Sequence, residues 1–122
     1  MNRVESAARN LLGCRFRLHG RDPTHGLDCV GVVACATGLS APSGYAVRSG
    51  EPGKIARLME GAGLHKVAET TAGDVMLMRV GPGQLHLGIR TATGMIHADA
   101  GLRRVVERLG EPDWEIVGRW RL

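Results

Sequence analysis

One cysteine, Cys29, directly follows an aspartate that is placed to cap a helix. The segment CVGVVACAT at 29–37 has the composition of a short apolar helix between Asp28 and Gly38, although its valines would also suit a buried strand. The unpaired N–H groups and the dipole at a helix N-terminus favour a thiolate, the nucleophilic form of cysteine, and can also stabilise an oxyanion. Cys29 is therefore our candidate nucleophile. The alternative is a small buried side chain, the usual role of an unpaired cysteine.

Two histidines are candidates for a partner base. In QLHLGIR at 84–90 the alternation of apolar residues turns His86 away from the core face, and His97 alternates in the same way within 94–98. If the two segments form a hairpin, the imidazoles are cross-strand neighbours, and a neutral His97 can accept a hydrogen bond from the ring N–H of His86. The alternatives are two surface histidines, or a zinc site with Cys29, which lacks an accompanying carboxylate. We expect no metal and no cofactor.

The elements that must position these residues change from helical to strand periodicity along the chain. Apolar spacing predicts helices over residues 2–12, 29–37 and around Ile55 to Met59, the first ending at Gly13 and the last closed by Gly61 and Gly63. Residues 13–27 and 38–53 read as connections. Strands are predicted at 75–78, 84–90, 94–98, 103–109 and 116–121. This order predicts a single α+β domain over 1–122, with N-terminal helices packed on an antiparallel sheet of about five to six strands.

Composition narrows the function classes. The 122 residues are 43% hydrophobic and 23% charged, which excludes a disordered chain or a coiled coil, and no apolar run is long enough to span a membrane. The net charge of +4 suits an anionic polymer or nucleic acid, but the arginines are scattered, which favours a general solubilising surface. The three cysteines form no CxxC pair, so neither a disulfide scaffold nor a structural zinc site is expected.

Four short motifs, taken in order, resemble the NlpC-type cell-wall cysteine peptidases. They are GLDCVG at 26–31 with the segment 13–23 before it, GDVMLM at 73–78, HLGI at 86–89 and MIHA at 95–98. The resemblance runs from about residue 5 to the C-terminus. It implies a papain-like α+β fold in which the nucleophile lies at a helix N-terminus packed on an antiparallel sheet.

The resemblance also implies a role for each matched residue. Cys29 would be the nucleophile, His86 the general base and acid, and His97 the residue that orients His86. Asp28 would help to hold the free amine end of a peptidoglycan stem peptide. The implied reaction is hydrolysis of the bond between D-γ-glutamyl and a diamino acid through a thioester.

Departures from the family pattern fall on substrate recognition. Val30 replaces the usual serine after the nucleophile, Phe16 replaces the usual tyrosine, and His19-Gly20 replaces paired glycines. Phe16, Arg21 and Val30 are still expected to line the substrate site with Asp28.

The setting in which the protein works is expected to be a phage or phage-like tail. The N-terminus lacks the apolar core of a signal peptide, and the segment WEIVGRW at 114–120 resembles the end of stand-alone NlpC-type domains of phage tails. Delivery to the cell wall by such a particle is therefore an expectation, with tail proteins as partners. The alternatives are a Cys–His amidase or acyltransferase, an inert adaptor of the same fold and, least favoured, a nucleic-acid binder.

Overall fold

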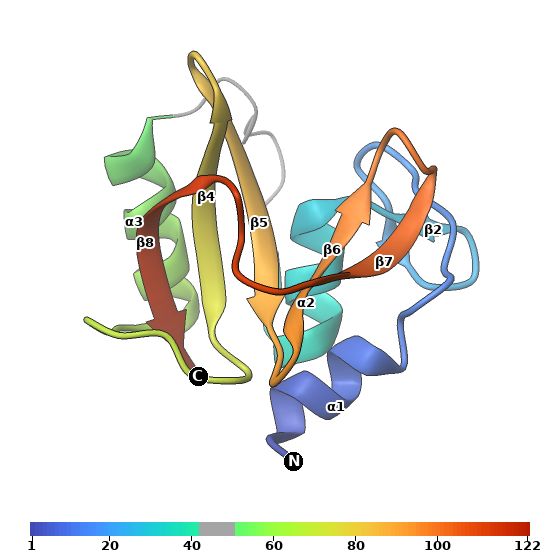
Figure 1. Cartoon of the computed structure of the whole chain (residues 1–122), viewed down its shortest axis with the longest axis horizontal. Helices are drawn as coiled ribbons and strands as arrows, with labels where there is room; N and C mark the ends of the chain where they lie inside the picture. The colour runs from blue at the N-terminus through green and yellow to red at the C-terminus, as the bar shows by residue number, and fades with distance from the viewer. Residues whose placement is uncertain (42–50) are drawn as a thin grey trace.

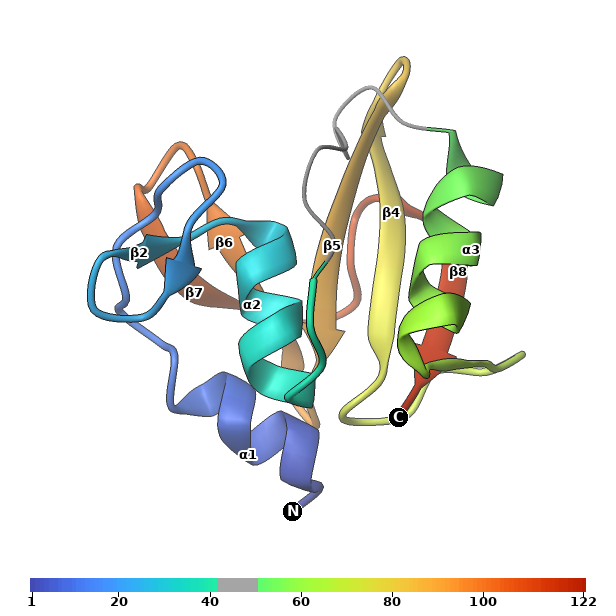
Figure 2. The ribbon, with the colours of Figure 1, turned by 180° about the vertical axis from the view of Figure 1, so that it is seen from behind.

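Three helices pack on one face of the sheet. The computed structural model describes residues 1–41 and 51–122, so most of the connection expected at 38–53 lies outside the described residues. The helices are α1 (Arg3–Arg9), α2 (Cys29–Thr37) and α3 (Pro52–Ala62), and Figure 2 shows α2 and α3 in front of the sheet and α1 at its lower end. Within the described parts of the chain, no helix has both the length and the apolar character that crossing a bilayer requires.

The ends of the helices follow from their capping residues. The carboxylate of Asp28 accepts a hydrogen bond from the N–H of Gly31, and Gly38 ends α2 in the left-handed conformation, so the boundaries predicted for this helix are confirmed. Helix α1 is shorter than predicted because Asn10 caps it and turns continue to Gly13. Helix α3 is longer than predicted because it begins at a proline, a residue suited to the first turn, and runs through Gly61.

The main sheet has six antiparallel strands in the order β3-β8-β4-β5-β6-β7. This confirms the predicted α+β class and the expected number of strands. The strands are β3 (His65–Lys66), β4 (Val75–Gly81), β5 (Gln84–Arg90), β6 (Gly94–Asp99), β7 (Arg104–Leu109) and β8 (Glu115–Arg121).

A small second sheet lies in the segment that we expected to be a plain connection. Strands β1 (Arg21–Asp22) and β2 (Gly26–Leu27) pair antiparallel, and two isolated bridges tie Arg15 to β7 and Phe16 to β2. Strands of two residues carry no readable alternation, which is why the sequence did not predict them. Their effect is to fold the segment before α2 back onto the first turn of that helix.

Apolar side chains form separate clusters on the two faces of the sheet. The helix side is the main core, where Leu85, Leu87 and Ile89 of β5 meet the valines of α2. The other face holds Met76, Met78 and Met95, with Trp114 and Ile116 packed against them. The connection that carries Trp114, between β7 and β8, crosses this second face in Figure 1.

Strands β5 and β6 are paired only near their hairpin turn. Their register comprises Ile89 with Ile96 and Arg90 with Met95, and beyond these pairs the strands separate. In Figure 1, α2 is visible behind the opening between the two strands. Since α2 contacts both strands, the opening gives the start of this helix access to side chains on β5 and β6.

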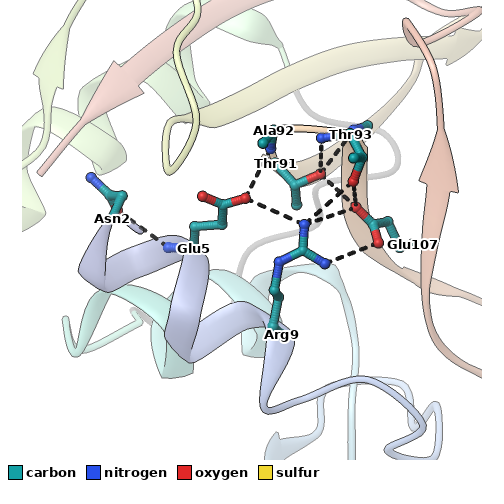
Figure 3. Close-up of polar contacts among 8 residues, drawn as sticks. Asn2, Glu5, Arg9, Thr91, Ala92, Thr93 and Glu107 are labelled. Atoms are coloured by element: carbon teal, nitrogen blue, oxygen red, sulfur yellow. Dashed lines mark hydrogen bonds and ion pairs between the residues drawn. The ribbon is translucent and has the colours of Figure 1, made fainter.

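A polar cluster fixes the turn at which β5 and β6 meet (Figure 3). One carboxylate oxygen of Glu107 accepts hydrogen bonds from the hydroxyls of Thr91 and Thr93, both at 2.6 Å, and the guanidinium of Arg9 donates to both oxygens. Buried Glu5 accepts from the backbone N–H of Ala92 at 2.8 Å. These contacts, called the α1 clasp below, attach the first helix to the closed end of the hairpin.

Candidate active site

Cys29 occupies the first turn of α2 and contacts the free edge of β5. The residue as a whole is half-buried, while its sulfur is shielded from water and receives hydrogen bonds from the backbone of Leu87 and of Val30. The N–H of Thr91 bonds the carbonyl of Gly94 across the hairpin. Residues two apart along a strand direct their N–H groups to the same edge, so the N–H of Leu87 also points toward β6. Because β6 has separated at this level, the Cys29 sulfur takes the place of the missing partner strand.

Burial raises the pKa of the Cys29 thiol to about 11. The two backbone hydrogen bonds and the nearby Arg21 act in the opposite direction, while the carboxylate of Asp28 adds to the rise. The lowered pKa expected from the helix N-terminus is therefore wrong, because loss of water around the sulfur outweighs the helix dipole. The resting group is a neutral thiol that needs a base in order to react.

His86 and His97 are joined directly. Nε2 of His86 lies 2.8 Å from Nδ1 of His97, and the two rings meet edge to face with centroids 5.0 Å apart. His86 is a neighbour of Leu87, whose backbone contacts the Cys29 sulfur, and both His86 and Cys29 line one cavity. The structure thus brings the three residues selected from the sequence into one place.

The surroundings of His97 fix the direction of this hydrogen bond. Only 2% of His97 is exposed, and burial lowers its pKa, so the ring is neutral at neutral pH. Its buried Nε2 has no hydrogen-bond partner in the part of the chain that the structure describes, and Oδ2 of Asp99 lies 4.0 Å away. A proton on Nε2 is favoured by that carboxylate. With the proton there, Nδ1 of His97 accepts a hydrogen bond from Nε2 of His86.

Trp114 covers the histidine pair from the second face of the sheet. Its ring lies 5.8 Å from the ring of His86 and 5.8 Å from that of His97, nearly perpendicular to both. The guanidinium of Arg108 stacks over the indole at 4.6 Å and is paired with Asp113 at 3.1 Å. This stack shields the hydrogen bond between the histidines from solvent on that side.

The cavity beside Cys29 has a volume of about 210 Å³. Phe16, Arg21, Asp28 and Val30, all selected from the sequence as substrate-binding residues, line it. The remaining lining residues are Leu18, His19, Val80, Gln84, Leu85, Ala98 and Ala100. His19, one of the departures from the family pattern, is therefore part of this cavity.

The carboxylate of Asp28 is already engaged by three donors. Oδ1 accepts from the guanidinium of Arg21 at 2.7 Å and from the N–H of Gly31 at 2.9 Å. Oδ2 accepts from the N–H of His19 at 2.9 Å, and the whole residue is only 8% exposed.

The other histidines and cysteines lie apart from the histidine pair. His25 pairs with Asp22 on the surface, and His65 is exposed on β3. The three cysteines form no disulfide with one another; Cys35 donates a weak hydrogen bond to the carbonyl of Arg21. No group of three or more histidine, cysteine or acidic side chains among the described residues is arranged to hold a metal ion.

Two residues of the site, Asp99 and Trp114, were not selected from the sequence as site residues. Asp99 lies two residues after His97 and so on the same side of β6, a spacing that the alternation already contained. Trp114 follows the last turn before β8, and its position over the histidines depends on the path of that connection. No sequence period predicts such a path.

Comparison with known proteins finds similarity in structure. No family model and no curated protein sequence matches the chain. The NlpC/p60 domain of the peptidoglycan hydrolase SagA is 26% identical, with a TM-score of 0.59 over 89% of this chain and 90% of that domain. NlpC1 from Trichomonas vaginalis is 18% identical, with a TM-score of 0.70 over 98% of this chain. The chain corresponds to 44% of the length of NlpC1.

Proposed function

We propose that this chain, whose fold and motif order are those of the NlpC-type family, is a cysteine peptidase that hydrolyses peptidoglycan stem peptides. The observation that carries the proposal is the site itself. The Cys29 sulfur and His86 line one cavity, and His86 is held by a hydrogen bond of 2.8 Å to a buried, neutral His97. A nucleophile, a base and a residue orienting that base are the parts that a thiol acyl-transfer site requires.

In the first half of the proposed reaction, Nδ1 of His86 takes the thiol proton as the Cys29 sulfur attacks the scissile carbonyl. The C–S bond forms and the carbonyl π electrons move onto oxygen. The N–H of Gly31 already bonds Asp28, and the backbone of Val30 bonds the sulfur. We therefore assign the backbone N–H of Cys29, at the start of α2, as a donor to the oxyanion.

The tetrahedral intermediate then collapses to a thioester. The C–N bond breaks, and the leaving amine takes the proton held by His86. Water replaces the amine, His86 removes a proton from it, and the thioester is hydrolysed to a carboxylate with the thiol restored. The raised pKa of Cys29 fits this sequence, because proton transfer to His86 accompanies attack.

The proposed scissile bond joins D-γ-glutamyl to a diamino acid. Two facts support this choice: the order of the four sequence motifs and the similarity to the NlpC/p60 domain of a peptidoglycan hydrolase. The three departures at Phe16, His19 and Val30 lie in the cavity lining rather than at the histidine pair.

Defined muropeptides test the proposal. Purified protein incubated with a tripeptide L-Ala-γ-D-Glu-diaminopimelate, free or N-acylated, should release diaminopimelate, detected by mass spectrometry, and Cys29→Ala should release none. Cleavage of a different amide would identify the protein as an amidase or acyltransferase of the same chemistry. Absence of any cleavage by the wild-type protein would overturn the proposal.

Two departures from the family pattern favour a second candidate, an inert adaptor with this fold. Phe16 and Val30 replace the usual tyrosine and serine in the cavity lining, which removes two hydroxyl groups from the site. A thiol-reactive activity probe separates the two candidates. If the protein is an enzyme, the probe should label the wild-type protein faster than the His86→Gln variant. If it is an adaptor, the two proteins should be labelled at the same rate.

Delivery by a phage-like tail is the proposed setting of the activity. It rests on the resemblance of the segment WEIVGRW at 114–120 to the end of stand-alone NlpC-type domains of phage tails. Co-purification with tail particles from an induced culture would support it. Recovery only as free protein, from a culture that also yields intact particles, would contradict it.

A further inference from the structure

The negative charge of the Asp28 carboxylate is already balanced by other groups of the protein. Its two oxygens accept hydrogen bonds from the Arg21 guanidinium, from the N–H of Gly31 and from the N–H of His19, at 2.7 to 2.9 Å. A substrate ammonium needs a carboxylate with free lone pairs and uncancelled charge. Asp28 offers little of either, because a cation already lies against it.

Arg21 is held at this position by the backbone. The same nitrogen, Nη1, also donates to the carbonyl of Gly20 at 2.9 Å. A Cβ at Gly31 would lie 2.2 Å from the carbonyl oxygen of Gly20, so only glycine allows the segment before β1 to approach α2 this closely. The close approach fixes Arg21 against Asp28 rather than leaving it mobile at the surface.

The guanidinium still has donors to offer to the cavity. Within the described residues, Arg21 makes its hydrogen bonds through Nη1 alone, and 35% of its side chain is exposed. Nε and Nη2 therefore remain to donate to an acceptor such as an amide carbonyl. A second cation brought to this end of the cavity would instead be repelled.

We propose that the Arg21–Asp28 pair makes this site select stem peptides whose N-terminus is acylated, as it is in the intact wall polymer, and reject stem peptides that end in a free ammonium. This inference rests on the proposed peptidase function and names the substrate form that it takes. Arg21 is the specificity-determining residue, with the acyl carbonyl of the substrate accepting from its guanidinium. Asp28 then serves to hold Arg21 and to cap α2.

The experiment compares L-Ala-γ-D-Glu-diaminopimelate with its N-acetylated form. For the wild-type protein, kcat/KM should be at least about tenfold higher for the acetylated peptide, because the free ammonium would lie beside the guanidinium of Arg21. Arg21→Gln keeps a hydrogen-bond donor near Asp28 but removes the cation, so the preference should shrink to near equality or reverse. Arg17→Gln is the matched control, an exposed arginine outside the cavity lining, and should keep the wild-type preference.

A pH series on the wild-type protein tests the same inference without any substitution. The α-amino group of a peptide loses its charge near pH 8. Cleavage of the free peptide relative to the acetylated one should therefore rise several-fold between pH 7 and pH 9. A wild-type preference for the free peptide, or a preference unchanged by both Arg21→Gln and pH, overturns the inference while the peptidase function stands. Cleavage of neither peptide overturns both.

Discussion

His86 and His97 share a hydrogen bond of 2.8 Å although β5 and β6 are not paired with each other at either residue. Strands β5 and β6 have separated by this level, and the two imidazoles meet between them. In a continuous ladder, the backbone edge of β5 would be occupied by β6. Here that edge is left to the Cys29 sulfur, so the separation of the strands creates the site.

Loss of the Cys29 sulfur should abolish hydrolysis without unfolding the protein. Cys29→Ser removes the nucleophile but keeps a small polar side chain at the start of α2. We expect at least a thousandfold loss of kcat, about the scale of nucleophile removal in other acyl-transfer enzymes, with an unchanged circular dichroism spectrum. Cys14→Ser, away from the cavity lining, is the control and should retain activity.

The two histidines should differ in the size of their effects. His86→Gln removes the base, and we expect kcat to fall about 10²- to 10⁴-fold. His97→Gln keeps an amide oxygen that can accept from His86, so its loss should be smaller. Steady-state kinetics on the same muropeptide measure both. An equal or larger loss in His97→Gln would contradict the assigned roles.

Asp99 should influence the pH dependence of kcat rather than the binding of substrate. Its carboxylate favours the proton on Nε2 of His97, so Asp99→Asn should weaken the control of the tautomer of that ring. We expect a lower kcat, an unchanged KM and a shifted acid limb in the pH profile of kcat. A change confined to KM would show that Asp99 contacts the substrate instead.

Alkylation of Cys29 should report its raised pKa. With a pKa of about 11, the thiolate fraction at pH 7 is only roughly 10⁻⁴. In His86→Gln, the rate of reaction with iodoacetamide should be very low at pH 7 and should climb steadily to about pH 11. In the wild-type protein, proton transfer to His86 should give a higher rate at pH 7. Identical rate profiles in the two proteins would favour the inert adaptor.

Glu107 should make the stability of the protein sensitive to acid. Hydrogen bonds from Thr91 and Thr93, with a smaller contribution from Arg9, lower the pKa of Glu107 from 4.5 to about 2. A carboxyl group whose pKa is lowered by folding stabilises the fold at every pH above its pKa in the unfolded chain. This contribution is lost as the pH falls from about 4.5 to 2.

We expect a loss of about 1–2 kcal/mol in the free energy of unfolding from this group, because solvent screens part of the interaction. Urea unfolding between pH 7 and pH 2 measures it. Glu107→Gln should be less stable at pH 7 and should show a flatter pH dependence. Glu115→Gln, an exposed carboxylate on the same sheet, should follow the wild-type curve.

Sequence reasoning selected three residues that the structure brings together, but it predicted neither the electrostatics of the site nor the surrounding contacts. Cys29, His86 and His97 were found because capping and alternation are local patterns that the fold preserves. The raised pKa of Cys29 depends on how closely β5 covers the sulfur, which no local pattern encodes. The pairing of Arg21 with Asp28 likewise depends on two short strands that bring positions seven apart together.

The α1 clasp has a consequence for the distant end of the hairpin. It fixes the apex of a wedge whose two arms carry the histidines of the proposed site, and His86 lies about 10 Å along its arm from the last paired residue. A rotation of about 6° at the apex would displace His86 by about 1 Å, enough to slow an oriented reaction by about a hundredfold. Helix α1 contributes no residue to the cavity lining, yet it fixes the angle between the two strands. We therefore expect substitutions at Arg9 or Glu5 to lower the rate of hydrolysis before they lower the stability of the fold.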